Sequence, residues 1–188
     1  MATTTFPTST VSRIGTHEGS TPIARVFATA DSIPLLVTRL TLGLVMLPHG
    51  LQKTLGIYGG YGFHGTMGFF TQQGIPAWLA FLAIMAEALG SLGLITGFLA
   101  RIAAFGIFCN MLVATVLVHM PNGLFMNWSG LQKGEGFEFH LLAMGLAIAV
   151  MVGGAGRGSF DRLIWRRKFE RDSAIDRGTG FRIRVANP

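Results

Sequence analysis

The hydrophobic positions of this chain fall into four long apolar segments separated by short polar stretches. The segments cover about residues 33–51, 75–99, 102–120 and 139–156. Each approaches the roughly 20 apolar residues that a helix needs to cross about 30 Å of hydrocarbon. The segments are apolar around the whole helical circumference, and a backbone in lipid must pair its own polar groups. The pattern therefore predicts an all-α integral membrane protein, a bundle of four transmembrane helices.

Composition separates this membrane domain from two polar ends. Only 13% of the 188 residues are charged, about half the usual share of roughly 25% in soluble domains. Residues 1–32 are rich in Thr and Ser, so we expect a disordered tail there, without a cleavable signal peptide. The four-helix domain is expected over residues 33–158, with the glycine-rich residues 54–73 forming a loop over the bundle. Residues 159–188 form a basic tail whose aromatic residues suit a membrane surface.

The basic residues indicate how the bundle is oriented. With four spans, both tails and the turn between the second and third segments lie on one side of the membrane. That side carries every Lys and Arg except Lys53 and Lys133. Because cytoplasmic segments are enriched in Lys and Arg, both termini are predicted to be cytoplasmic. The membrane orientation therefore explains the net charge of +6, and nucleic-acid binding is not required to explain it. The single cysteine, Cys109, excludes an intrachain disulfide.

Histidines gather at the predicted outer ends of the segments, together with Lys53. His49 and Lys53 are four residues apart, so they share a face if the helix continues past Pro48. The other histidines of this group are His64, His119 and His140. Such a group can bind a metal, ligate haem or hydrogen-bond a quinone carbonyl, but no HxxxH or HExxH spacing occurs and no metal site is predicted. The alternative is that these side chains only reach from the interface toward water.

Three polar residues lie deeper in the predicted bundle. Glu87 falls near the middle of residues 75–99, where a carboxylate is costly unless protein or water shields it. With a helical rise of about 1.5 Å per residue, Asn110 lies at a similar depth, and the long side chain of Arg39 points toward that level. One interpretation is an Arg39–Glu87 pair that fixes helix register. The other is a carboxylate that accepts a proton or orients a ligand head group, and the two are compatible.

The order of several motifs resembles the DoxX family of small bacterial membrane proteins. The matching elements are Arg39, PHGLQK at 48–53, a glycine-rich loop reaching GIP at 74–76, MAEALG at 85–90, LITGFLAR at 94–101 and GGAGRGSFD at 153–161. They lie within residues 33–164. The resemblance implies a four-helix protein of the bacterial inner membrane. Some members are linked to thiosulfate:quinone oxidoreductase, where they act with a partner subunit, and others to complexes that handle oxidative stress.

The residues and the resemblance together lead to a functional hypothesis. We expect a subunit of quinone-linked redox metabolism or of an oxidative-stress complex, with lipid, an oxidoreductase subunit and further copies of the chain as partners. The hypothetical proton and ligand site consists of Glu87, His49, Lys53 and Arg39. The hypothetical contacts to a quinone, or to a haem, are His49, His119, His140 and Asn110.

The sequence leaves one alternative function open and disfavours another. A non-enzymatic scaffold or lipid-binding subunit would use its polar residues only to stabilise the bundle. A transporter is disfavoured, because four helices without an evident inverted repeat leave little room for alternating access.

Overall fold

The computed structural model describes residues 22–170 of the 188-residue chain, and this part consists of helices and loops. The helices are α1 (Pro22–Phe27), α2 (Ile33–Thr54), α3 (Gly62–Gln72), α4 (Ala77–Thr96), α5 (Ala100–Ala114), α6 (Glu138–Gly153) and α7 (Phe160–Trp165). A π-helical turn, Thr115–His119, and a 3-10 turn, Met120–Asn122, continue α5, and a second π-helical turn, Arg166–Glu170, continues α7. The prediction of an all-α fold is therefore confirmed. The tails are predicted at residues 1–32 and 159–188, and their outer parts, residues 1–21 and 171–188, lie outside the described residues.

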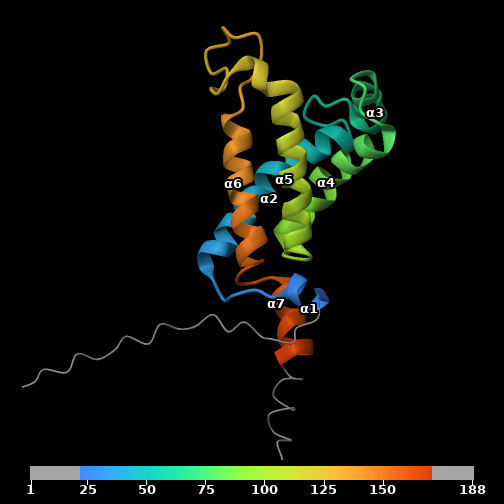
Figure 1. Cartoon of the computed structure of the whole chain (residues 1–188). Helices are drawn as coiled ribbons and strands as arrows, with labels where there is room; N and C mark the ends of the chain where they lie inside the picture. Colours follow the sequence, from blue (N-terminus) through green and yellow to red (C-terminus); the bar gives the residue numbers. More distant parts are fainter. Residues whose placement is uncertain (1–21, 171–188) are drawn as a thin grey trace, which may run out of the picture.

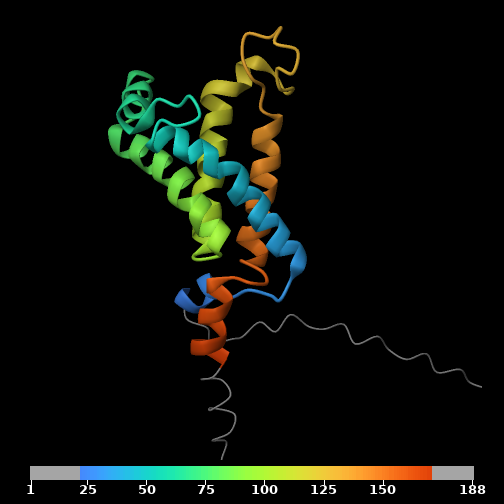
Figure 2. The same cartoon turned by 180° about the vertical axis from the view of Figure 1, so that it is seen from behind.

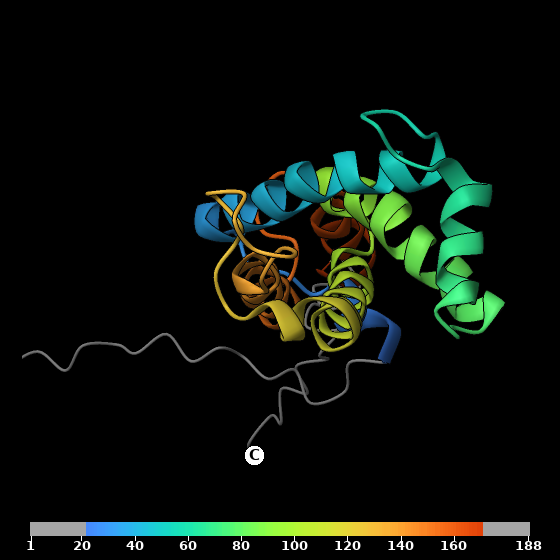
Figure 3. The same cartoon turned by 90° about the horizontal axis from the view of Figure 1, so that it is seen from above.

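Four of these helices form the bundle. Helix α2 packs against α4 and α6, and α5 packs against the same two helices. Helices α5 and α6 stand side by side, while α2 and α4 cross them obliquely (Figures 1 and 2). Viewed from above, α5 and α6 appear nearly end-on and α2 is seen along its length (Figure 3). The core between them is built from buried side chains that include Leu42, Met46, Leu94, Ile107, Ala147 and Val150.

Three helical stretches are long and apolar enough to cross a membrane. They are Ile33–Thr54, Ala77–Thr96 and Ala100–Asn122, and α6 is apolar but shorter. Large apolar side chains such as Leu89, Leu142 and Val152 point out of the bundle and are 62%, 70% and 76% exposed. A lipid surrounding accounts for these faces, because outward apolar groups are favourable there and costly in water.

The first apolar helix is longer than the sequence predicts. Helix α2 continues through Pro48 and ends at Thr54 instead of near residue 51. A proline is tolerated inside a transmembrane helix because neighbouring groups satisfy the backbone. At the end of the helix, the Thr54 hydroxyl donates a hydrogen bond of 2.7 Å to the Gly50 carbonyl. The stretch expected as a loop, residues 54–73, also differs, since it contains α3 packed on α2 and α4.

Helices α1 and α7 lie together at one end of the bundle, which we call the terminal end, and the loop of residues 123–137 lies at the opposite end, the loop end (Figures 1 and 2). Residues 22–27 belong to the stretch expected to be a disordered tail, yet they form a helix that contacts α7. Ala24 is only 3% exposed, so burial of its apolar surface accounts for this order.

Asp161 at the start of α7 closes the turn between α4 and α5. Its two carboxylate oxygens accept hydrogen bonds of 2.7 and 2.9 Å from the backbone N–H groups of Leu99 and Ala100. Those N–H groups begin α5 and have no partner within the helix, so the carboxylate acts as its N-terminal cap. Gly97 ends α4 with φ 68, and a Cβ there would lie 2.4 Å from Ser159 Cβ. The turn therefore needs glycine and holds α7 against the bundle.

Candidate functional site

Glu87 of α4 lies at the centre of a polar cluster inside the bundle. Its side chain is 3% exposed, and Oε2 forms an ion pair with Nζ of Lys53 from α2. Oε1 accepts a hydrogen bond of 2.6 Å from the Asn110 side-chain amide of α5. Both oxygens of the buried carboxylate are thus held by side chains from two other helices. The similar depth that the sequence predicts for Glu87 and Asn110 is confirmed by this contact.

Gly50 brings α2 close enough to α4 for Lys53 to reach Glu87. A Cβ at Gly50 would lie 2.7 Å from Ala88 Cα and 2.8 Å from Ala88 N, closer than real Cβ contacts. The two backbones therefore touch one residue beyond Glu87 along α4. Lys53 lies about one turn after Gly50 along α2, on the side that faces this contact.

Substitution of Gly50 by alanine is expected to separate α2 from α4 and weaken the Lys53–Glu87 pair. The obstacle is backbone, which cannot move aside as a flexible side chain can, so we expect a loss of about 1–3 kcal/mol in unfolding free energy. Thermal unfolding in detergent measures this, with Gly145→Ala of α6 as the control because a Cβ there meets nothing within 4 Å. Equal melting temperatures for the two variants would contradict the close contact.

Arg39 does not pair with Glu87, so that interpretation of the sequence is wrong. The guanidinium of Arg39 is 1% exposed and lies at the terminal end. It donates to five backbone carbonyls at 2.6–3.4 Å, those of Leu94, Ile95, Ala155, Arg157 and Gly158. The physical reason is that carbonyls at the end of α4 and in the loop after α6 lack helical partners. Arg39 satisfies them and therefore ties α2 to both segments.

His119 and His140 stack against each other at the loop end. Their ring centroids are 4.1 Å apart with an angle of 40° between the planes. Nδ1 of His119 lies 2.8 Å from the Glu135 backbone carbonyl, and because a carbonyl only accepts, Nδ1 carries the proton in this contact. His140 is 7% exposed, and its Nδ1 has no hydrogen-bond partner among the described residues. A buried nitrogen without a partner is costly, so this atom is suited to a ligand.

His49 connects the histidine pair to the carboxylate. Its ring lies 5.7 Å from that of Phe139, the residue before His140. On α2, His49 lies one turn before Lys53, the residue that pairs with Glu87. The shared face of His49 and Lys53 is confirmed. The cluster thus unites all the predicted site residues except Arg39: Glu87, His49, Lys53, Asn110, His119 and His140.

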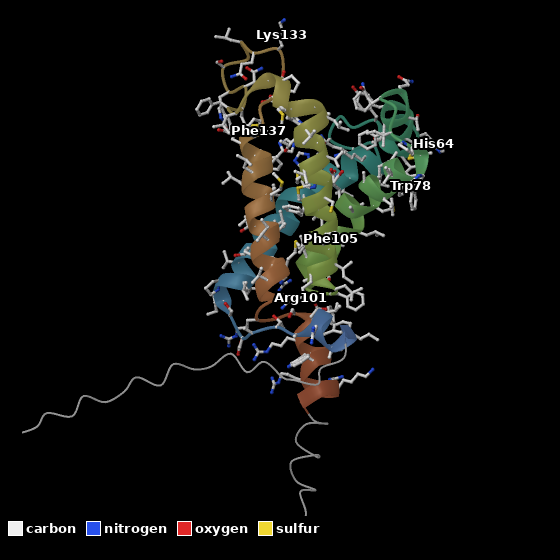
Figure 4. The ribbon with its side chains drawn as sticks, in the orientation of Figure 1. His64, Trp78, Arg101, Phe105, Lys133 and Phe137 are labelled. Carbon is white, nitrogen blue, oxygen red and sulfur yellow. The ribbon has the colours of Figure 1, made fainter. Side chains whose placement is uncertain are left out.

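His64 does not join this cluster. It belongs to α3, where its ring contacts Phe63 at a centroid distance of 5.7 Å, and the side chain is exposed. Figure 4 places it beside Trp78, on the flank formed by α3 and the start of α4. The histidine group that the sequence suggests is therefore reduced to three members.

The arrangement of the cluster bears on which cofactors fit. No group of three or more His, Cys, Asp or Glu side chains within residues 22–170 is arranged to hold a metal ion. An iron held axially between two histidines needs two metal–nitrogen bonds of about 2 Å each, so the ring centroids must be well over 4 Å apart. The His119–His140 stack of 4.1 Å leaves no room for it. A quinone carbonyl, which needs only a hydrogen-bond donor, is compatible with the unpartnered Nδ1 of His140.

A pocket of about 480 Å³ lies far from this cluster, at the terminal end. It is lined by Asp31, Thr96, Arg157, Gly158, Ser159, Phe160, Arg162, Leu163 and Arg166. Asp31 forms ion pairs with two of these residues, Arg157 and Arg162. The pocket therefore belongs to the packing of α7 against the bundle and contains none of the six residues of the cluster.

Two contributors to the site have no signal in the sequence. The carbonyl of Glu135 is a backbone atom, so its contact with His119 depends on the fold of the loop and not on residue type. The π-helical turn at Thr115–His119 adds one residue to a helical turn and thereby changes the direction in which His119 points. Neither the π-helical turn nor the position of the Glu135 carbonyl can be predicted from the pattern of apolar residues.

Comparison with models of protein families matches residues 34–120 to the DoxX family. The matched range includes Arg39 and five residues of the cluster, and His140 and Asp161 follow it. No curated protein and no solved structure shows significant similarity to the chain. Together with the three membrane-length helices and the motifs around Arg39 and Glu87, the match identifies the chain as a membrane protein that carries a DoxX family domain over residues 34–120.

Proposed function

We propose that the protein is a bacterial inner-membrane subunit of quinone-linked redox metabolism, and that a quinone head group binds at the polar cluster. The observation that carries this proposal is the buried Nδ1 of His140, which has no partner within the described chain, in a bundle that also holds the buried Glu87 carboxylate paired with Lys53. Polar side chains from four helices, α2, α4, α5 and α6, and from the turn after α5 converge there inside an apolar bundle. Intramembrane ionisable groups of this kind mark ligand or proton sites more often than packing alone.

The proposed orientation places the terminal end in the cytoplasm and the loop end outside. It rests on the distribution of Lys and Arg. Apart from Lys53 and Lys133, these residues are Arg39, Arg101 at the start of α5, and residues before α2 or after α6. Helix α6 is taken as the fourth span. Its 16 residues cover about 24 Å, short of the roughly 30 Å of a hydrocarbon core. The chain just before α6 must therefore complete the crossing.

Each member of the cluster has a defined chemical capacity. A bound quinone supplies two-electron chemistry that is coupled to two protons. Lys53 and His140 can donate hydrogen bonds to a carbonyl, and Glu87 can hold a proton at a carboxylate oxygen that Asn110 orients. His119 is half-buried and its ring packs against that of His140, so it can position the His140 imidazole.

Quinone retention by the purified protein tests the proposal. We expect the wild-type protein in mild detergent to keep close to one quinone per chain, and Glu87→Gln and His140→Leu to bind a short-chain ubiquinone at least tenfold more weakly. His64→Ala, outside the cluster, serves as the control and should bind as the wild type does. Unchanged binding by Glu87→Gln, His49→Ala and His140→Leu would rule the site out.

A structural role is the second candidate, and one observation favours it. Both oxygens of Glu87 already have partners in the chain, so the carboxylate needs no ligand to be satisfied. In a scaffold or lipid-binding subunit, Glu87→Gln would lower the melting temperature in detergent and leave quinone retention unchanged. The same set of variants therefore separates the two functions.

A further inference from the structure

The loop of residues 123–137 is held in shape by hydrogen bonds to two acidic side chains, that of Glu135 within the loop and that of Glu138 at the start of α6. Oε2 of Glu135 accepts from the Asn127 backbone N–H at 2.7 Å. Oε1 of Glu138 accepts from the Met126 backbone N–H at 3.2 Å and from the Trp128 indole at 3.1 Å. Two carboxylates, the exposed one of Glu135 and the half-buried one of Glu138, thus fix the loop backbone at Met126 and Asn127.

The outer surface of this loop is apolar. Phe125, Trp128 and Leu131 are 67%, 85% and 89% exposed. The indole N–H of Trp128 is bonded inward while its ring faces out, and Lys133 lies at the tip (Figure 4). Large apolar side chains held outward by an ordered loop indicate a surface that is covered by something other than water.

This apolar surface is continuous with the lipid-facing sides of the helices that enter and leave the loop. Val116, Leu117 and Val118 are 51%, 58% and 50% exposed just before it, and Leu141 and Leu142 are 48% and 70% exposed just after it. Helix α6 is also too short to complete a crossing by itself, as described above. A tryptophan at this level suits the membrane–water interface, where an apolar ring and a polar N–H are both accommodated.

The loop is joined directly to the histidine pair. The carbonyl of Glu135 contacts Nδ1 of His119 at 2.8 Å and accepts from the Asn122 side-chain amide at 3.2 Å. A shift of the loop would therefore move His119 relative to His140. We propose that Phe125, Trp128 and Leu131 insert into the lipid leaflet at the loop end, and that this anchor fixes His119 against His140. The inference rests on the proposed crossing by α6 but not on quinone binding.

Fluorescence quenching of Trp128 in liposomes tests the insertion. The Trp78→Phe/Trp165→Phe variant keeps Trp128 as its single tryptophan. We expect phospholipids brominated near the head-group end of the acyl chain to quench its emission strongly, and aqueous iodide to quench it weakly. Strong iodide quenching with no effect of brominated lipid would overturn the proposal and indicate a surface open to water or to a protein partner. A melting temperature equal to that of the wild type establishes that the variant is folded.

A second measurement tests the link to the site. In the Trp128→Ser/Leu131→Ser variant, the imidazole NMR signals of His119 and His140 should shift in lipid, while the signal of His64 on α3 should not. Unchanged signals for all three residues would show that insertion does not position the pair. Quinone retention is measured separately, so failure of the lipid anchor and failure of the quinone site give different results.

Discussion

Replacement of Arg39 by methionine is expected to lower the melting temperature in detergent by about 10 °C, corresponding to a loss of roughly 3 kcal/mol or more. The variant keeps most of the buried side-chain volume but removes the guanidinium donors to five backbone carbonyls, including those of Ile95 and Ala155. The Leu94 carbonyl keeps a backbone donor, the Gly97 N–H. A buried carbonyl that loses its partner keeps its desolvation cost, and several such carbonyls are affected together.

Thr38→Ala is the matched control for this prediction. Thr38 precedes Arg39 on α2, and its hydroxyl donates only to the Pro34 carbonyl within the same helix. A melting temperature for Arg39→Met as high as that of Thr38→Ala would contradict the role of Arg39 at the terminal end. Quinone retention per folded protein should be unchanged in Arg39→Met, because Arg39 is not part of the cluster.

Glu87 and Lys53 are expected to show strong coupling in a double-mutant cycle. Glu87→Gln leaves the Lys53 ammonium beside a neutral amide, and Lys53→Met leaves the carboxylate with Asn110 alone. Each single change should cost about 2 kcal/mol in unfolding free energy, below the roughly 3–5 kcal/mol of a fully buried pair, because the Lys53 side chain is 26% exposed.

The double variant should recover part of this loss, with a coupling energy of about 1–2 kcal/mol. Unfolding by denaturant in mixed micelles provides the four free energies. Lys133→Met, at the tip of the loop, controls for the removal of a lysine outside the bundle (Figure 4). Strict additivity of Glu87→Gln and Lys53→Met would show that the ion pair contributes nothing to stability.

The length and apolarity of the segments predict the helices well, and helical spacing predicts part of the site. Each of the four apolar segments corresponds to one bundle helix, because length and apolarity are local properties of the chain. The spacing of four between His49 and Lys53 and the similar depth of Glu87 and Asn110 also follow from helical geometry alone. These relations need no knowledge of how the helices are tilted.

Partners between helices depend on that tilt, and there the prediction fails. Counting residues along straight helices brings the side chain of Arg39 to the level of Glu87. Helix α2 is tilted relative to α5 and α6 and runs antiparallel to α4, with Gly43 against Ile95 and Gly50 against Ala88. It is therefore Lys53 that meets Glu87. The stack of His119 on His140 depends on a π-helical turn and on the fold of a loop, neither of which has a periodic signature.

The surroundings of Arg39 and of Glu87 differ in how they can vary through evolution. Arg39 recognises main-chain oxygens, which are the same whichever side chains occupy positions 94, 95 and 155, so mutations there need no change at Arg39. At Glu87 every contact is with another side chain, so replacement of Lys53 or Asn110 changes the chemistry of the partner itself. In related chains, the residue types at positions 94, 95 and 155 should therefore vary independently of Arg39. Substitutions at positions 53, 87 and 110 should occur together.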